Sequence, residues 1–501
     1  MKKIILILST IFALGLYSCS DSFLVVESKS SILESNYYNS AERLYSGLVA
    51  AYDPLQWFDY FYQYNSLNMV SDIMADDIYT GGANEGDQPI LVKAHFYTAT
   101  PTDVPNMIWT TAYSGVNRSN IVIAKAPEIE MDQALKNLYV AEAKILKAYY
   151  YNILWKFWGN IPYYDENLSF PYICDQMKAD EVYQNVITLV EEALTANVLP
   201  MKARAGEEGR ITRAMAYMLY TEMVLYQNDE SRFGKALQYM KEIIDSNEYS
   251  LVNDFKNIWE EAGEWGSESI WEINYISEGG VRDWGNPIAT GGSVYPVLIG
   301  IPGYVGNAFC DGWGFSPVAE SAYAMYDESD IRRDGGILNF AKHADQTGAS
   351  YTARWQDTGY FLLKYIGRKN GNHGYTADPN LNYGNNQRIY RYAETLLNAA
   401  ELIVRGAGSG DAQMYLNAIR TRAQVPSVSA TLDNILEERR LEFLGEGKRY
   451  WDLVRSGKAE SVLTATNHLY RTENWTPQKK YWPIPQSEID KSAGTLTQNP
   501  Y

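Results

Sequence analysis

Two stretches of the chain combine tryptophan, tyrosine and aspartate with many glycines and asparagines, and they hold the best candidates for binding chemistry. They span residues 72–96 and 275–386. The face of a Trp or Tyr ring can stack on the apolar C–H face of a sugar, while carboxylates and amides bind the sugar hydroxyls. The candidate ligand-binding residues are Asp76, Asp77, Tyr79, Asp283, Trp284, Tyr295, Tyr304, Asp311 and Trp313. The alternative for each ring is that it packs beneath its own loop.

The composition of the whole chain favours recognition at a half-exposed surface. There are 41 Tyr and 13 Trp but 14 Phe, and filling a core does not by itself require the polar tips that Tyr and Trp carry. The formal charge of −18 makes the chain a poor partner for nucleic acid or for an anionic lipid surface. We therefore expect no nucleic-acid partner.

The acidic residues of the first stretch are weaker candidates for a metal site. Asp72, Asp76 and Asp77 offer the oxygen ligands that Ca²⁺ prefers, but their spacing does not match an EF-hand loop. A structural or hydrogen-bonding role is the better interpretation. The sequence predicts no metal and no cofactor.

The sequence contains none of the catalytic motifs that a short pattern can identify. Its four histidines, at positions 95, 343, 373 and 468, are far apart and form no H-E-x-x-H motif. It has neither a G-x-S-x-G elbow nor a Walker loop. We expect a binding protein rather than an enzyme. A glycosidase is kept as an alternative, because its two carboxylates can be distant in the chain.

The densest group of charges lies in "ERRLEFLGEGKRYWDLVR" (Glu438–Arg455). Phe443 and Trp451 give the same segment an apolar face, so its charges must lie beside or within a packed surface. A partly buried charge is tolerated only when it is paired. We therefore interpret Arg439, Glu442 and their charged neighbours as a structural ion network rather than an active site.

Helices predicted from hydrophobic periodicity must position these residues. The expected helices are Ser40–Ala51, Pro105–Lys125, Leu138–Phe157, Ala179–Ala196, Ile211–Tyr226, Phe233–Ser246, Asn386–Arg405, Asp411–Ala423 and Leu432–Arg455. Short turns join them in pairs similar to tetratricopeptide repeats, although the chain has no clean fixed period. The prediction is a mainly α, single large domain with a tetratricopeptide-like helix-pair scaffold and a loop-rich irregular half. The tryptophans expected in its core are Trp109, Trp158, Trp259, Trp271 and Trp451.

The N-terminus has the pattern of a lipoprotein signal peptide. Two lysines precede an apolar run, Ile4–Leu16, which is too short to span a bilayer but fits the apolar region of a signal peptide. Cys19 follows a small residue at the expected cleavage point. We expect residues 1–18 to be removed, Cys19 to be lipidated, and residues 19–501 to form the mature domain, with a loop-rich insert at about 275–386. An ordinary secretory signal with a chance cysteine is the alternative.

Several segments together resemble the SusD/RagB family. The most specific are "RYAETLLNAAELI" (Arg391–Ile403), "ERRLEFLGEGKRYWDLVR" and the ending "YWPIPQSEIDKSAGTLTQNPY" (Tyr481–Tyr501). "SDIMADDIYTGG" (Ser71–Gly82) and "KAYYYNILWKFWGNIPYY" (Lys147–Tyr164) also fall in the family's order. The resemblance covers essentially the whole mature chain.

This resemblance implies a lipoprotein of the outer membrane that faces the cell exterior and is anchored by its N-terminal lipid. Such proteins cap a TonB-dependent transporter barrel and capture nutrient for import, most often an oligosaccharide and in some members a peptide. Their fold packs tetratricopeptide-like helix pairs against a loop-rich half that carries the ligand site. Besides oligosaccharide capture, peptide capture, glycoside hydrolysis and a pure assembly scaffold stay open as functions.

Overall fold

The computed structural model describes residues 37–369 and 374–501. The expected signal peptide, residues 1–18, and the expected lipidation site, Cys19, lie outside the described residues. Four positions of the expected insert, 370–373, lie outside them too.

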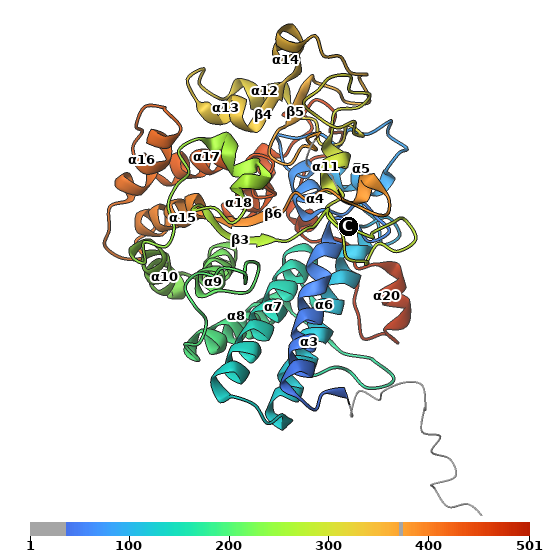
Figure 1. Cartoon of the computed structure of the whole chain (residues 1–501), viewed down its shortest axis with the longest axis vertical. Helices are drawn as coiled ribbons and strands as arrows, with labels where there is room; N and C mark the ends of the chain where they lie inside the picture. The colour runs from blue at the N-terminus through green and yellow to red at the C-terminus, as the bar shows by residue number, and fades with distance from the viewer. Residues whose placement is uncertain (1–36, 370–373) are drawn as a thin grey trace, which may run out of the picture.

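A continuous series of packed helices forms one half of the molecule (Figure 1). Each of its first seven members contacts the next along the series, and α16 and α17 both pack on α15. The series comprises α3 (Ala41–Tyr52), α6 (Asn106–Lys125), α7 (Gln133–Trp158), α8 (Ala179–Thr195), α9 (Arg213–Gln227), α10 (Phe233–Asp245), α15 (Tyr392–Val404), α16 (Ala412–Arg422) and α17 (Leu432–Glu442). The predicted mainly α architecture with tetratricopeptide-like helix pairs is confirmed.

Short helices, two-stranded sheets and long loops form the other half, at the top and right of Figure 1. Its helices are α4 (Leu67–Ile73), α5 (Pro89–Phe96), α11 (Tyr295–Ile299), α12 (Glu320–Ala324), α13 (Ile331–Gly336), α14 (Phe340–Thr347), α18 (Arg449–Arg455), α19 (Ala459–Val462) and α20 (Gln486–Lys491). The antiparallel strand pairs are β1 (Ile161–Pro162) with β2 (Gln176–Met177), β3 (Ser269–Ile273) with β6 (Gln387–Arg391), and β4 (Ile337–Asn339) with β5 (Tyr360–Leu362).

Side-chain caps determine where several scaffold helices begin. The hydroxyl of Thr212 accepts a hydrogen bond from the backbone N–H of Met215 at 3.1 Å, so α9 begins one residue after the threonine. Ser40 caps α3 and Asp132 caps α7 in the same way. These contacts satisfy backbone donors that no residue inside the helix can pair.

Two of the predicted helices are wrong in part. The first residues of the predicted helix at 386–405 form strand β6, because they pair with β3 before the chain turns into α15. The predicted helix at 432–455 is two helices, α17 and α18, separated by a turn. Gly445 and Gly447 hold left-handed backbone conformations in that turn, with φ of 79° and 71°, and glycine adopts these at the lowest cost.

The predicted core tryptophans are confirmed. Trp109, Trp158, Trp259, Trp271 and Trp451 are all buried. Trp158 donates its indole N–H to the carbonyl of Pro483, and Trp271 donates to the carbonyl of Gly209, both at 3.0 Å. These bonds tie α7 and β3 to distant loops and satisfy the indole N–H groups of Trp158 and Trp271.

The predicted structural ion network is also confirmed. Arg439 is buried and binds Asp452 of α18 at 2.8 Å, Asn398 of α15 at 2.8 Å and Glu394 of α15 at 3.2 Å. Burial by itself would raise the pKa of Asp452, but Arg439 and Arg455 lower it to about 2. A depressed carboxyl pKa stabilises the fold above the unfolded value near 4, and this stabilisation is lost as the pH falls toward 2.

We expect Arg439→Ala to destabilise the protein by about 3 kcal/mol, because it takes an arginine partner away from two buried carboxylates, Glu394 of α15 and Asp452 of α18. Thermal unfolding followed by circular dichroism measures this as a lower Tm. Arg439 is buried, so affinity for the expected oligosaccharide should be unchanged. A folded Arg439→Ala protein that has lost affinity would contradict the structural assignment.

None of the described helices is both long enough and apolar enough to cross a bilayer. Cys174 and Cys310 are free thiols in the structure, and their sulfurs donate to backbone carbonyls.

Candidate functional site

Two of the predicted residues, Trp284 and Trp313, stack on each other at the surface of the loop-rich half. Their ring centroids are 5.9 Å apart and their planes are inclined by 21°. Tyr60 meets the edge of Trp284 at 5.4 Å, and Tyr64 lies 5.5 Å from Trp313. Trp284 is 37% exposed and Trp313 is half-buried. We call Tyr60, Tyr64, Trp284 and Trp313 the aromatic platform.

The tyrosines of the platform come from a tight turn outside the predicted binding stretches. Tyr60 and Tyr64 pair across this turn through an isolated antiparallel bridge. Tyr62 at its tip is 60% exposed and has a left-handed φ of 58°. This conformation is costly for a residue other than glycine, and such strain concentrates at binding sites. The detectable signal was the aromatic run "FDYFYQYN" (Phe58–Asn65), which lies outside the two glycine-rich stretches.

Hydrogen bonds fix the orientation of Trp284. Its indole N–H donates to Oδ2 of Asp378 at 2.6 Å. Asp283, another predicted residue, is exposed beside it and accepts the backbone N–H groups of Gly285 and Asn286. Asp283 therefore shapes the turn that carries Trp284, and its remaining acceptor capacity faces solvent.

Helix α11 and a close backbone contact position Trp313. The backbone N–H of Trp313 donates to the carbonyl of Val297 in α11 at 2.8 Å. Just before it, Gly312 lies against Gly300 so closely that a Cβ on Gly312 would come within 2.3 Å of the Gly300 backbone. A side chain at either glycine would push the segment away, so both glycines are required for the placement of Trp313.

The two tyrosines of the platform differ in exposure, since Tyr64 is half-buried and Tyr60 is buried. Burial raises the pKa of Tyr64 to about 12 and also raises the pKa of Tyr60. Both hydroxyls are therefore protonated at neutral pH and can donate hydrogen bonds as well as accept them. Ring faces next to such hydroxyls match the mixed apolar and polar surface of a sugar.

The predicted aspartates of the first stretch lie away from the platform, in ion pairs. Asp76 binds Arg449 at 2.8 Å, and Asp77 binds Arg440 at 2.6 Å. Asp72 accepts the backbone N–H of Gly447 at 3.0 Å. All three tie helix α4 and the following loop to the segment from α17 to α18.

Four further predicted residues make other contacts. Tyr79 is buried against His468 and Tyr470. Tyr295 is buried in α11, where its helix supports Trp313. Tyr304 is buried in a small separate core. Its hydroxyl lies 3.0 Å from Nε2 of His343. Asp311 is exposed and accepts backbone N–H groups of its own loop, including that of Gly303.

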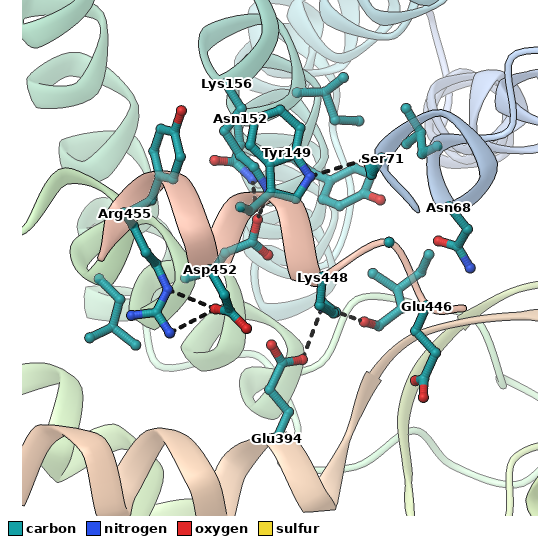
Figure 2. A pocket seen from close by; sticks show the side chains of 18 of the residues that line it. Asn68, Ser71, Tyr149, Asn152, Lys156, Glu394, Glu446, Lys448, Asp452 and Arg455 are labelled. Carbon is teal, nitrogen blue, oxygen red and sulfur yellow. Dashed lines mark hydrogen bonds and ion pairs between the residues drawn. The ribbon is translucent and has the colours of Figure 1, made fainter. Parts of the chain in front are cut away.

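A small cavity lies beside α18 (Figure 2). Its volume is about 100 Å³, below the roughly 300–1,000 Å³ typical of ligand pockets. Its charged side chains are paired with one another: Lys448 binds Glu394 at 3.0 Å, and Arg455 binds Asp452 at 2.7 Å. The cavity is thus part of the structural ion network and has no room for an oligosaccharide.

Two larger surface hollows lack the platform's arrangement of rings. One, of about 390 Å³, lies between α3 and the end of β3 and is lined by Val49, Ile276 and one exposed ring, Tyr45. The other, of about 630 Å³, has charged walls that include Glu260 and Arg368. Among the described residues, no group of three or more His, Cys, Asp or Glu side chains is arranged to hold a metal ion.

The fold and the platform together define a class of protein, a helical-repeat scaffold that carries an aromatic surface on long loops. Comparisons with known proteins agree. A model of the SusD family matches residues 341–501. The surface glycan-binding protein A from Bacteroides thetaiotaomicron, solved in complex with laminarihexaose, is 46% identical and superposes with a TM-score of 0.88. The match covers 92% of this chain and 100% of that chain.

Two more relatives extend the comparison. A solved laminarin-binding SusD-like protein is 30% identical with a TM-score of 0.84, over 92% of this chain and 100% of its own. SusD-like protein P38 from Formosa agariphila is 27% identical over 96% of each chain. The chain belongs to the SusD family.

Proposed function

We propose that the protein captures a glycan of the laminarin type on the aromatic platform and is not an enzyme. The observation that carries this proposal is the exposed stack of Trp284 and Trp313, flanked by Tyr60 and Tyr64. The similarity to one protein bound to laminarihexaose and to another described as laminarin-binding supports the choice of glycan. Sugar rings would stack on the indoles while the tyrosine hydroxyls and Asp283 bind sugar hydroxyls.

Affinity electrophoresis tests this proposal directly. The purified protein should be retarded in a gel that contains laminarin, and calorimetry should detect binding of laminarihexaose. Equal migration with and without laminarin, with no heat from laminarihexaose, would reject it. Release of shorter sugars during incubation would favour the glycosidase alternative, and binding of peptides alone would favour peptide capture.

The open geometry of the platform favours a glycan over a peptide. A peptide would be expected to pair its backbone with a strand edge in a deep groove. The platform instead offers ring faces from a turn and two loops.

We further propose that the protein works at the cell surface, anchored through Cys19 in the outer membrane, and passes its ligand to a TonB-dependent transporter. Family membership and the N-terminal sequence pattern support this arrangement. Recovery of a large TonB-dependent barrel in a mild-detergent pull-down of the native protein would support the partnership, and its consistent absence would count against it.

Cys19→Ala is expected to release the protein from the membrane fraction, because the acyl chains at Cys19 would be its membrane anchor. Fractionation of cells that express Cys19→Ala or the native sequence, followed by immunoblotting, measures the change. Cys174→Ala is the matched control and should stay with the membranes. Undiminished membrane association of Cys19→Ala would rule out the anchor.

A further inference from the structure

We propose that Arg282, paired with Asp59, is the positioning residue that fixes the spacing of the aromatic platform; this inference rests on the proposed function. Both residues lie close to platform rings in the chain: Asp59 directly precedes Tyr60, and Arg282 lies two positions before Trp284. Their side chains are almost completely buried, with 0% and 1% exposure. Neither presents a surface to a ligand, so any effect on binding must act through the platform.

The guanidinium of Arg282 connects the two halves of the site. Its Nη2 donates to the carbonyl of Tyr60 at 2.6 Å and lies 2.9 Å from Oδ1 of Asp59. Its Nε and Nη1 donate to the carbonyls of Pro287 and Gly292, at 2.7 and 2.9 Å. One rigid group thus holds the tyrosine turn and the Trp284 loop, which are more than 200 positions apart in the chain.

Asp59 completes the connection from the other side. While Oδ1 pairs with Arg282, Oδ2 accepts the backbone N–H of Val294 at 2.6 Å. Val294 directly precedes α11, the helix whose carbonyl at Val297 holds Trp313. The Asp59–Arg282 pair therefore also fixes the support of Trp313.

Asn382 links the Asp59–Arg282 pair to Asp378, whose carboxylate orients Trp284. Its amide nitrogen donates to the carbonyls of Arg282 and Asp378, at 2.9 and 2.7 Å. Its amide oxygen accepts the N–H of Gly292 at 3.2 Å. Asp378 in turn accepts the indole N–H of Trp284. Every segment that carries a platform ring is tied to this group of buried polar side chains.

The chemistry of arginine explains why this position favours it. A planar guanidinium presents donors in fixed directions and can serve several acceptors at once, whereas the ammonium of lysine is a compact charge on a flexible stem. Arg282→Lys therefore keeps the charge that Asp59 requires but cannot maintain all the bonds to the carbonyls of Tyr60, Pro287 and Gly292. All four platform rings would still be present, but the distances between them would no longer be fixed. Loss of this preorganisation weakens ligand affinity.

The test compares Arg282→Lys with Arg332→Lys. Arg332 is a matched control because it is equally buried and pairs with several carboxylates, including Glu438 at 2.6 Å, away from the platform. Binding of laminarihexaose is measured by calorimetry, and stability by Tm. Near-ultraviolet circular dichroism reports the coupling of the stacked Trp284 and Trp313 without any ligand.

Both lysine variants should have a lower Tm. Only Arg282→Lys should weaken laminarihexaose binding, by about 10-fold or more, and change the tryptophan dichroism. Asp378→Ala, on a half-buried residue, should weaken binding in the same direction even if Arg282→Lys does not fold.

Unchanged affinity and dichroism in folded Arg282→Lys, unchanged affinity in Asp378→Ala, or equal losses in Arg332→Lys would overturn the inference. If the native protein binds no glycan, the proposed function fails, while the dichroism comparison still decides whether Arg282 positions the rings.

Discussion

Replacement of both Trp284 and Trp313 by alanine is expected to abolish measurable glycan binding. The two indoles form the exposed stack at the centre of the platform, and Tyr60 and Tyr64 pack against them rather than replace them. A central aromatic residue in a binding site typically contributes about 2 kcal/mol or more. Loss of two such rings should weaken affinity by more than about 100-fold. Affinity electrophoresis in laminarin and calorimetry with laminarihexaose measure the loss.

A second pair of exposed rings provides the control. Phe170 and Tyr172 are 85% and 69% exposed, with centroids 6.2 Å apart, in the loop between β1 and β2. The double alanine variant of this pair should bind like the native protein. Both double variants should keep the native far-ultraviolet circular dichroism spectrum, since Trp284 is exposed and Trp313 is half-buried. Retained binding without Trp284 and Trp313 would show that the site lies elsewhere.

Glu442→Gln is expected to produce the largest loss of stability. The fully buried carboxylate of Glu442 pairs with Arg422 at 2.5 Å, Arg391 at 3.0 Å and Arg332 at 3.2 Å. Burial alone would raise the pKa of Glu442, but the three guanidinium groups hold it below its usual range. Removal of the charge leaves buried arginines under-neutralised and should cost about 3–5 kcal/mol. Chemical unfolding measures the difference in free energy.

Glu437→Gln is the matched control on the same helix. Its side chain is 51% exposed and lies 3.7 Å from Arg440, and exposed pairs of this kind contribute about 0–1 kcal/mol. The two variants remove the same charge from α17 and differ in burial. A Glu442→Gln protein as stable as Glu437→Gln would show that the buried network does not hold the helices together.

At the start of the predicted helix 386–405, a tertiary contact overrides the helical pattern of the local sequence. Ile389, Tyr392 and Leu396 fit helical spacing, so the periodicity extended through Gln387–Arg391. Residues Gln387–Arg391 instead form strand β6 and pair with β3, a segment more than 110 positions earlier in the chain. A helical period and a strand pairing partner are separate signals, and only the first can be read locally.

The sequence predicted the types of residue that form the candidate site, but it did not predict which individual aromatic residues form it. Trp284 and Trp313 stood out because they are aromatic residues in glycine-rich loops. Tyr79 and Tyr295 have similar surroundings in the sequence, yet both are buried. Tyr60 and Tyr64 contribute to the platform from a turn that follows a helical segment. Which rings face solvent depends on packing partners that are far away in the chain.

The sequence by itself determined the helical scaffold, the buried tryptophans and the need to pair the charges of Glu438–Arg455, because helical periodicity and the cost of burying charge are local properties. The tertiary structure alone decided which rings meet and which aspartates bind arginine. Asp77 and Arg440 are 363 positions apart, and Arg282 and Tyr60 are 222 apart. Contacts across such distances exist only once the scaffold has closed, since no local preference of either residue specifies the other.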